Sequence, residues 1–380
     1  MGKVTILLLV FVGTVMVSIA GQSPACAGPS LPLRRQGYGG LAGVGSTDFR
    51  NSPSRQSYER WRNIEFVGHY SFKGDVFEDK DLSGIACVSE TQCLLGADEG
   101  RQVQVGELSK EGKWLRVLTD VALVDSGKEI DIEAIAAEID CYYIVGSHGL
   151  AKKDGEFQEN RYKIFRLKVD PATGLPAGAP APKLRLAPAP VAGAASAKVL
   201  QVTSLSDILK ADAVLGPYFQ KPLQHNGVNI EGLAVKHGQL FVGFRSPNLG
   251  GKAYVMEIAA ERLFGDKKGR NYRLHSFSLG QGYGIRELVA AQSCFLIIAG
   301  NSGSEPSDKF PKSENYQEDR GYVMYSWDGS SSKVHRIGPI ENPPGKAEAM
   351  TVLSESEQQM EVLILFDGAD KGRPSVYRIY

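Results

Sequence analysis

The chain has 380 residues, of which 42% are hydrophobic and 23% are charged, a composition typical of a globular protein with a sizeable core. Lysine plus arginine total 43 and aspartate plus glutamate total 43, so the formal net charge is zero. No strong overall field therefore favours nucleic acid or an acidic membrane surface. We expect neither of them as a partner.

Residues 1–27 have the parts of a signal peptide. Lys3 supplies a positive charge, an apolar run follows from Ile6 to Ile19, and small residues flank two cleavage sites. The alternative is an uncleaved anchor, but the run is shorter than the roughly 20 residues that a membrane span needs. We therefore predict cleavage after Ala27 or after Ala20, export to the periplasm or the medium, and no membrane span in the mature chain.

The rest of the chain divides into a lead-in and one folded domain. Residues 28–60 are rich in glycine, serine, arginine and proline and lack apolar periodicity, which predicts a flexible lead-in. The folded domain is placed at residues 61–380. Residues 171–197, rich in proline and alanine, interrupt it as a predicted surface excursion without fixed structure.

The folded region contains five copies of one two-strand unit. Each copy pairs a short strand that contains a small residue with a strongly apolar strand, and the copies begin at Asp81, Asp131, Asn229, Gly284 and Lys346. A third strand follows in every copy, and a fourth in all but the last. Four strands per copy, at spacings of about 50 to 60 residues, are typical of β-propeller blades. The sequence therefore predicts an all-β, five-bladed β-propeller of antiparallel four-stranded blades.

The last copy lacks a fourth strand because the chain ends. The segment from Ile64 to Ser71 is extended and alternately apolar. We predict that it supplies the missing strand and closes the ring, which removes an open sheet edge. The second copy is longer than the others because of the insertion, which leaves a six-bladed ring as the alternative.

Four cysteines remain once the leader and Cys26 are removed, an even number in a compartment that permits disulfides. Cys87 and Cys93 flank a short polar loop between two apolar strands, so a local bridge is feasible if their Cβ atoms face each other. The alternative is that the cysteines are reduced core residues, and the pairing of Cys141 and Cys294 stays open.

Polar residues recur at strand ends that would meet at one rim of the central channel. In a propeller, the start of each first strand and the end of each second strand share a rim. At one motif position the first strands are aligned to carry a serine and four glutamates: Ser83, Glu133, Glu231, Glu287 and Glu348. Near the ends of the second strands lie Asp98, His148, Arg245 and Asn301. We therefore expect a polar site at this rim.

Four glutamates in register would repel one another, by roughly 3 kcal/mol for each pair at about 6 Å and an effective dielectric constant near 20. Such a ring needs a cation or protonated members. Calcium takes oxygen ligands and is common in exported proteins, so we expect one divalent cation, calcium first, bound by Glu133, Glu231, Glu287, Glu348 and Asn301. The alternative is that each glutamate caps backbone N–H groups of the neighbouring blade.

The strings DIEAIA at Asp131, NIEGLA at Asn229 and GIRELV at Gly284 resemble those of a bacterial family of exported proteins known as domain of unknown function 3616. The resemblance covers residues 61–380. It implies the propeller fold and export, and no particular reaction.

A looser resemblance concerns the pair Glu231-Gly232, which is similar to motifs of phytase-like, esterase-like and lactonase propellers, whose channel carboxylates hold calcium. The chain departs from them because alanine follows Glu133 and Glu348, and leucine follows Glu287. These differences put the transfer of any named reaction in doubt.

Two classes of function follow from the rim. The first is a metal-assisted hydrolase of small esters or phosphoesters, in which the cation polarises the scissile bond. His148 or Asp98 would act as general base, and Arg245 would hold an anionic group. The second is a non-catalytic module that binds a small molecule or a protein on this face. Whether the chain is an enzyme stays open at the level of sequence.

Overall fold

The computed structural model describes residues 58–138, 140–170, 175–176, 195–196, 201–265 and 271–380. The predicted signal peptide, the lead-in as far as residue 57 and most of the insertion lie outside these residues. Strands dominate the described residues, and no helix among them is long and apolar enough to cross a membrane.

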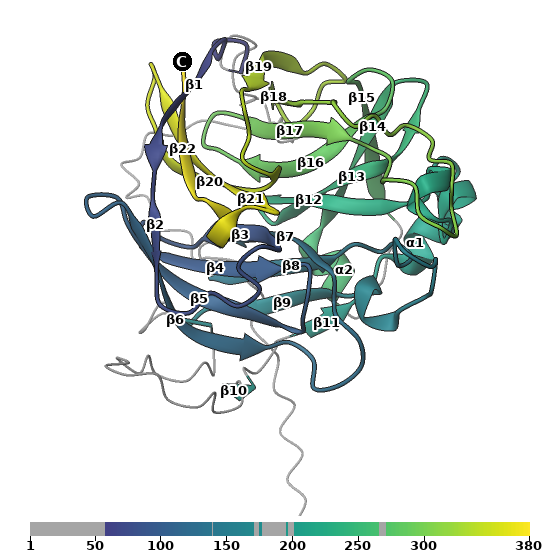
Figure 1. The fold of residues 1–380 in the computed structure, drawn as a ribbon, viewed down its shortest axis with the longest axis horizontal. Helices are drawn as coiled ribbons and strands as arrows, with labels where there is room; N and C mark the ends of the chain where they lie inside the picture. The colour runs from purple at the N-terminus through teal and green to yellow at the C-terminus, as the bar shows by residue number, and fades with distance from the viewer. Residues whose placement is uncertain (1–57, 139, 171–174, 177–194, 197–200, 266–270) are drawn as a thin grey trace, which may run out of the picture. The chain divides into compact units, whose positions relative to one another are not determined.

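Five antiparallel sheets of four strands each form a β-propeller (Figure 1). From the innermost strand outwards, the first three blades are β3 (Leu82–Cys87), β4 (Gln92–Ala97), β5 (Gln102–Ser109), β6 (Trp114–Ala122); β7 (Ile132–Glu138), β8 (Cys141–Gly146), β9 (Ile164–Lys168), β11 (Gln201–Thr203); and β12 (Asn229–Lys236), β13 (Gln239–Leu249), β14 (Lys252–Ala259), β15 (Tyr272–Ser278). The last two are β16 (Tyr283–Ala290), β17 (Phe295–Asn301), β18 (Tyr322–Trp327), β19 (His335–Ile340); and β20 (Lys346–Glu355), β21 (Met360–Asp367), β22 (Ser375–Ile379), β1 (Ile64–His69).

The innermost strands contact one another in the order β3, β7, β12, β16, β20 and back to β3, so the ring is closed. The five-bladed prediction is confirmed, and the residues that the structure describes form no sixth blade. The remaining described elements are β2 (Ser71–Lys73), β10 (Ala195–Ser196), α1 (Ser206–Ala211), α2 (Ala260–Phe264) and the 3-10 helices η1 (Glu159–Tyr162), η2 (Gly216–Tyr218), η3 (Leu223–His225) and η4 (Asp370–Gly372).

The N-terminal strand closes the last blade, as predicted. β1 pairs antiparallel with β22, from Ile64 opposite Ile379 to His69 opposite Ser375. The predicted strand ran on to Ser71, but β1 ends at His69 and the chain continues into β2, which pairs parallel with β6 of the first blade. The segment therefore joins the last blade to the first.

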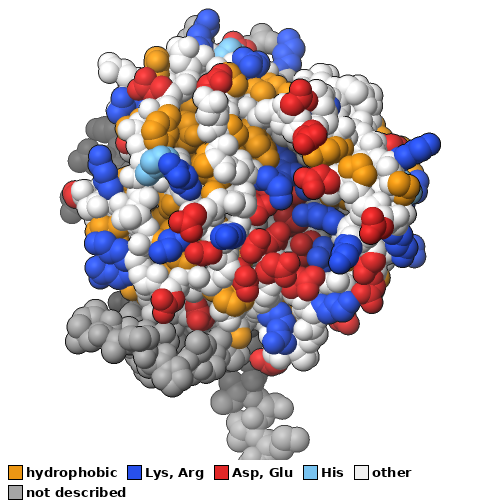
Figure 2. All heavy atoms as spheres, in the orientation of Figure 1, with side chains coloured by type: hydrophobic (Ala, Val, Ile, Leu, Met, Phe, Trp, Pro, Cys, Tyr) orange, Lys and Arg blue, Asp and Glu red, His pale blue; other side chains and the backbone are white. Residues whose placement is uncertain are grey.

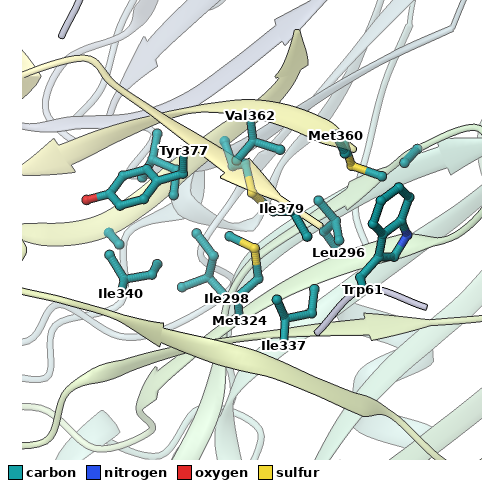
Figure 3. Close-up of a cluster of buried hydrophobic side chains, with 14 of the residues drawn as sticks. Trp61, Leu296, Ile298, Met324, Ile337, Ile340, Met360, Val362, Tyr377 and Ile379 are labelled. Carbon is teal, nitrogen blue, oxygen red and sulfur yellow. The ribbon is translucent and has the colours of Figure 1, made fainter. Parts of the chain in front are cut away.

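The core lies between the blades. Between the fourth and fifth blades, side chains from β17, β18, β19, β21 and β22 pack with Trp61, which is 1% exposed (Figure 3). Burying one large apolar side chain stabilises a fold by about 1.5–3 kcal/mol. Such clusters hold together blades that share no hydrogen-bonded ladder.

The small residue of the motif is required where adjacent innermost strands touch. A Cβ on Gly84 would lie 2.8 Å from Ile135 Cγ1 of the next blade, and one on Gly232 would lie 2.9 Å from Leu288 Cβ. Larger side chains would therefore separate the strands that line the channel.

A disulfide joins Cys87 and Cys93, which face each other across the β3–β4 pair with Cα atoms 3.9 Å apart. The local bridge, one of the two alternatives for these residues, is therefore present. Cys141 and Cys294 are buried.

Candidate functional site

Each innermost strand carries a β-bulge at the same place. One residue there is skipped in the pairing with the second strand, and the five skipped residues are Ser83, Glu133, Glu231, Arg286 and Glu348. A bulge re-aims the side chain of its extra residue. We call these five positions the bulge ring.

The bulge ring corrects the register expected for the fourth blade. The sequence alignment placed Glu287 at the shared position, whereas the structure places Arg286 there. Because successive side chains of a strand point to opposite faces, Glu287 does not join the ring. The signal for the correct register is the preceding isoleucine, since Ile285 stands before Arg286 as Ile132 stands before Glu133.

Glu287 secures the joint to the neighbouring blade instead. The residue is 1% exposed. Its Oε1 accepts a hydrogen bond from Leu288 N at 2.7 Å, and its Oε2 accepts one from Met350 N of β20 at 3.2 Å. Burial raises the pKa of this carboxyl well above its ordinary value, although the backbone N–H groups favour the charged form. Its contacts are those of a structural cap.

Arg286 connects the innermost strands of three blades. Its Nε lies 2.9 Å from Glu231 Oε2 on one side, and its Nη2 contacts Glu348 Oε1 on the other. All three side chains are buried. Since buried carboxylates are costly unless they are paired, this guanidinium supplies both glutamates with a positively charged partner.

Arg245, in the second half of β13, is the second guanidinium of this network. Its Nη1 donates to Glu231 Oε1 at 2.6 Å, and Nε and Nη2 donate to the carbonyls of Asn301 and Gly303 at 3.1 and 2.6 Å. The residue is 7% exposed. The sequence expected Arg245 to hold an anionic group, and the group it holds in this structure is Glu231.

Asn301, at the end of β17, holds the long connection from β17 to β18. Its Oδ1 accepts hydrogen bonds from Gln317 N and Arg320 Nη1, both at 3.0 Å, and its Nδ2 donates to Gln317 O at 2.8 Å. Its side-chain amide is thus occupied by the connection, and the structure does not bring Asn301 together with the glutamates as a shared ligand set.

Glu133, the bulge-ring residue of the second blade, faces Lys152. The glutamate is 2% exposed, and its Oε1 lies 4.0 Å from Lys152 Nζ and makes no hydrogen bond. Burial, with Glu231, Asp131 and Asp98 nearby, raises the pKa of Glu133 well above its ordinary value, and Lys152 opposes this rise. Burial by itself would lower the pKa of Lys152, but the surrounding carboxylates outweigh it, so that pKa is raised.

Asp98, just after β4, carries the clearest acid–base signature. Burial raises its pKa to about 7, and Asp131, Asp367 and Asp81 add to the rise while Lys152 opposes it. Its Oδ1 is buried and has no hydrogen-bond partner. A carboxyl with a pKa near neutrality is suited to donate or accept a proton.

His148 lies between two backbone groups. Its Nδ1 is 2.9 Å from Gly146 O, and its Nε2 accepts a hydrogen bond from Leu205 N at 3.1 Å. The ring is fully buried, and burial lowers its pKa to about 4. Both ring nitrogens are therefore occupied by the fold, which ties the start of α1 to the end of β8 and leaves neither of them to act as a base.

A cavity of about 610 Å³ lies beside these residues, with walls from the connections after β8, β17 and β19 and from side chains of β13 and β16. Six of its lining residues are cationic, namely Lys152, Lys153, Arg245, Arg286, Arg320 and Lys346, and three are acidic, namely Glu305, Glu318 and Asp319. On the face viewed in Figure 2, acidic side chains gather in a central hollow with Lys and Arg side chains beside them. We call the cavity of about 610 Å³ the mouth cavity.

In the described part of the chain, no group of three or more His, Cys, Asp or Glu side chains is arranged to hold a metal ion. Arg286 supplies positive charge between Glu231 and Glu348, where the sequence expected a cation. These two carboxylates therefore do not fit a calcium ion between them. Calcium binding by the expected ligands stays a prediction, which calorimetric titration with calcium tests.

Comparison with known proteins yields a family and weak structural likenesses. No curated protein matches the chain. Solved structures of a luciferin-regenerating enzyme, of an exo-β-1,3-galactanase from Phanerochaete chrysosporium and of streptogramin B lyase are each 10% identical to it, with TM-scores of 0.34, 0.42 and 0.35. The matches cover 83%, 84% and 85% of this chain and 94%, 64% and 99% of those chains. Likenesses this distant carry no argument about function.

A family model described as "Protein of unknown function (DUF3616)" matches residues 81–377. The match spans the innermost strands of all five blades and the lining of the mouth cavity. It confirms the resemblance seen in the three motif strings.

Proposed function

We infer the function of this chain, which belongs to the DUF3616 family of proteins of unknown function, from the geometry of the channel mouth. We propose that it is a ligand-binding β-propeller that takes a small organic anion into the mouth cavity. The observation that carries the proposal is the excess of cationic over acidic residues in the lining. A cavity of this volume is also in the range of small-molecule sites.

The cationic side chains differ in how many of their donors are already paired within the fold. Arg245 uses all three guanidinium nitrogens within the fold, and Arg286 uses two on glutamates, so they form a fixed positive wall. Lys152 is only loosely paired, at 4.0 Å from Glu133, and its side chain is 36% exposed. A wall that is positioned before binding favours affinity because little order is lost on association. We therefore propose that Lys152 contacts the anion directly and that Arg286 contributes its field.

Calorimetric titration with inorganic phosphate and with glutarate at low salt tests this proposal. Replacing Lys152 with alanine should raise the Kd about tenfold or more, the value of one charge-assisted hydrogen bond. Lys333→Ala removes one charge from an exposed site outside the cavity lining and should leave the Kd unchanged. Absence of binding by both anions at millimolar concentration, or equal effects of the two variants, would rule the proposal out.

Hydrolysis of small esters or phosphoesters is a second candidate, favoured by Asp98. We propose that its carboxyl, with a pKa of about 7, would move a proton to or from a substrate held by Lys152. Assays with p-nitrophenyl acetate and p-nitrophenyl phosphate test this. Activity should change with a midpoint near pH 7 and fall at least a hundredfold in Asp98→Asn. Activity that survives this substitution would exclude the role.

Export is also proposed. The Cys87–Cys93 disulfide supports it, because such bridges persist in oxidising compartments and are rare in the cytosol. Detection of the mature N-terminus by mass spectrometry of the periplasmic and culture fractions tests it, and recovery of the full-length chain from the cytosol alone would contradict it.

A further inference from the structure

Acidic side chains gather next to the cationic residues that line the mouth cavity. Four aspartates come from three blades: Asp81 precedes β3, Asp98 follows β4, Asp131 precedes β7 and Asp367 ends β21. Asp131 is paired with Arg161 at 2.6 Å and Asp367 with Lys346 at 2.7 Å. Asp98 has neither such an ion pair nor a hydrogen bond to its buried Oδ1. We call these four residues the acidic group.

The acidic group has too little positive charge around it. Burial and the neighbouring carboxylates raise the pKa of Asp98 to about 7, and they also raise the pKa of Asp81. Such a rise means that the surroundings disfavour the ionised form. A bound positive charge would reverse this effect.

Glu133 gives independent evidence for a missing donor at the same place. Its side chain is 2% exposed, and its Oε1 makes no hydrogen bond although it faces Lys152, which lines the mouth cavity. Buried carboxylate oxygens without partners are rare in proteins because they lose their hydration without gaining a hydrogen bond. Two of them, on Asp98 and Glu133, belong to carboxyls that interact with the same cavity lysine, Lys152.

An organic ammonium group fits this environment better than a metal ion. It carries one positive charge and three N–H donors, whereas the described residues contain no group arranged for a metal. The cationic residues of the mouth cavity lie next to these carboxyls, since Lys152 interacts with Asp98 and Glu133 and lines the cavity.

We propose that the ligand is zwitterionic, with an ammonium group toward Asp98 and Glu133 and a carboxylate toward Lys152 and Arg286, as in an amino acid or a short peptide. This inference rests on the proposed anion site and adds the second charge of the ligand. The free amino acid and the peptide share this chemistry, and they differ in the distance between their two charges.

Calorimetry with matched alanine derivatives tests the proposal. Alanine and trialanine carry both charges, N-acetylalanine carries only the carboxylate, and alanine amide carries only the ammonium. At least one zwitterion should bind tenfold or more tighter than both singly charged compounds. Stronger binding of alanine than of trialanine would identify a free amino acid, and the reverse order would identify a peptide.

Proton release gives a readout that a purely structural role for Asp98 would not affect. An ammonium next to Asp98 stabilises its ionised form, and this carboxyl is about half protonated at pH 7 because its pKa is about 7. Binding of the zwitterion at pH 7 should therefore release up to about half a proton from Asp98. Titrations in two buffers that differ in ionisation enthalpy measure this number. In Asp98→Asn the release should fall and the advantage of the zwitterion over N-acetylalanine should disappear. Glu90→Gln, at an exposed turn, should change neither.

The outcomes separate the two proposals. Equal binding of N-acetylalanine and the zwitterions would overturn the zwitterion inference and leave the anion site standing. Equal binding of alanine amide and the zwitterions would overturn it in favour of a simple cation site. If neither phosphate nor glutarate binds, the proposed function fails, and the zwitterion inference, which rests on it, fails with it.

Discussion

Arg286 Nε and Glu231 Oε2 lie 2.9 Å apart on the innermost strands of adjacent blades, and each side chain is 2% exposed. The same guanidinium contacts Glu348 of the next blade. One side chain thus neutralises carboxylates on both neighbouring blades at the centre of the ring. Charges buried in this way depend on each other, because removal of one leaves another unpaired.

Replacing Arg286 with methionine should therefore reduce the free energy of unfolding by about 3–5 kcal/mol, as expected when a buried ion pair loses one partner. Urea denaturation followed by tryptophan fluorescence measures the change. The control is Arg378→Met, which removes pairs with Glu65 of β1 and Glu361 of β21 and concerns an arginine whose side chain is 34% exposed. Its loss of stability should be much smaller, because exposed ion pairs contribute little to folding. Similar losses for the two variants would contradict the central role of Arg286.

Asp98 should make the protein less stable as the pH rises from about 4 to 7. Its folded-state pKa is about 7, raised from 3.8, so the folded state binds more protons than the unfolded state in this interval and stability falls with rising pH. Asp98→Asn should remove this slope and stabilise the protein at pH 8 by about 1–3 kcal/mol, given partial screening by solvent. Thermal melts at several pH values check it, with Glu90→Gln as the control for loss of a surface charge.

His148 should produce a slope of the opposite sign. Its folded-state pKa is about 4, lowered from 6.5, so the folded state binds fewer protons between these values and stability is lost as the pH falls through them. His148→Leu should cost about 2–4 kcal/mol at pH 7, since Leu205 N loses its acceptor, and should lose less stability on acidification. The exposed His225, changed to leucine, is the control. An unaltered acid limb in the His148 variant would argue against a neutral buried ring.

Closure of the ring by β1 predicts a sharp effect of truncation. A chain that begins at Phe72 lacks β1 and the buried Trp61, which exposes the edge of β22 and the cluster of Figure 3. Such an edge favours association, so this chain should melt without a cooperative transition and aggregate in size-exclusion chromatography. A chain that begins at Tyr58 keeps these contacts and should behave as the full protein. Melting of the shorter chain within about 2 °C of the longer one would refute closure.

The sequence by itself determined the architecture, because the information for it is local and repeated. The sequence of each blade has alternating apolar residues, with turns at regular spacing. Counting the strands in each copy showed that the last blade lacks one, and the extended segment at Ile64 could be assigned to that place. Residues such as Gly84 also show in the sequence where innermost strands approach closely.

Only the tertiary structure decided how the polar side chains at the rim are arranged and paired. The bulge in β16 exchanges a glutamate for Arg286 at the shared position, and a shift of one residue reverses which face a side chain joins. Sequence reasoning missed Lys152, whose pKa is raised by carboxylates on other strands. The pKa of about 7 at Asp98 arises from burial and from aspartates as distant in sequence as Asp367. Charge interactions depend on distance through space and on exclusion of water, and neither can be read from the order of residues.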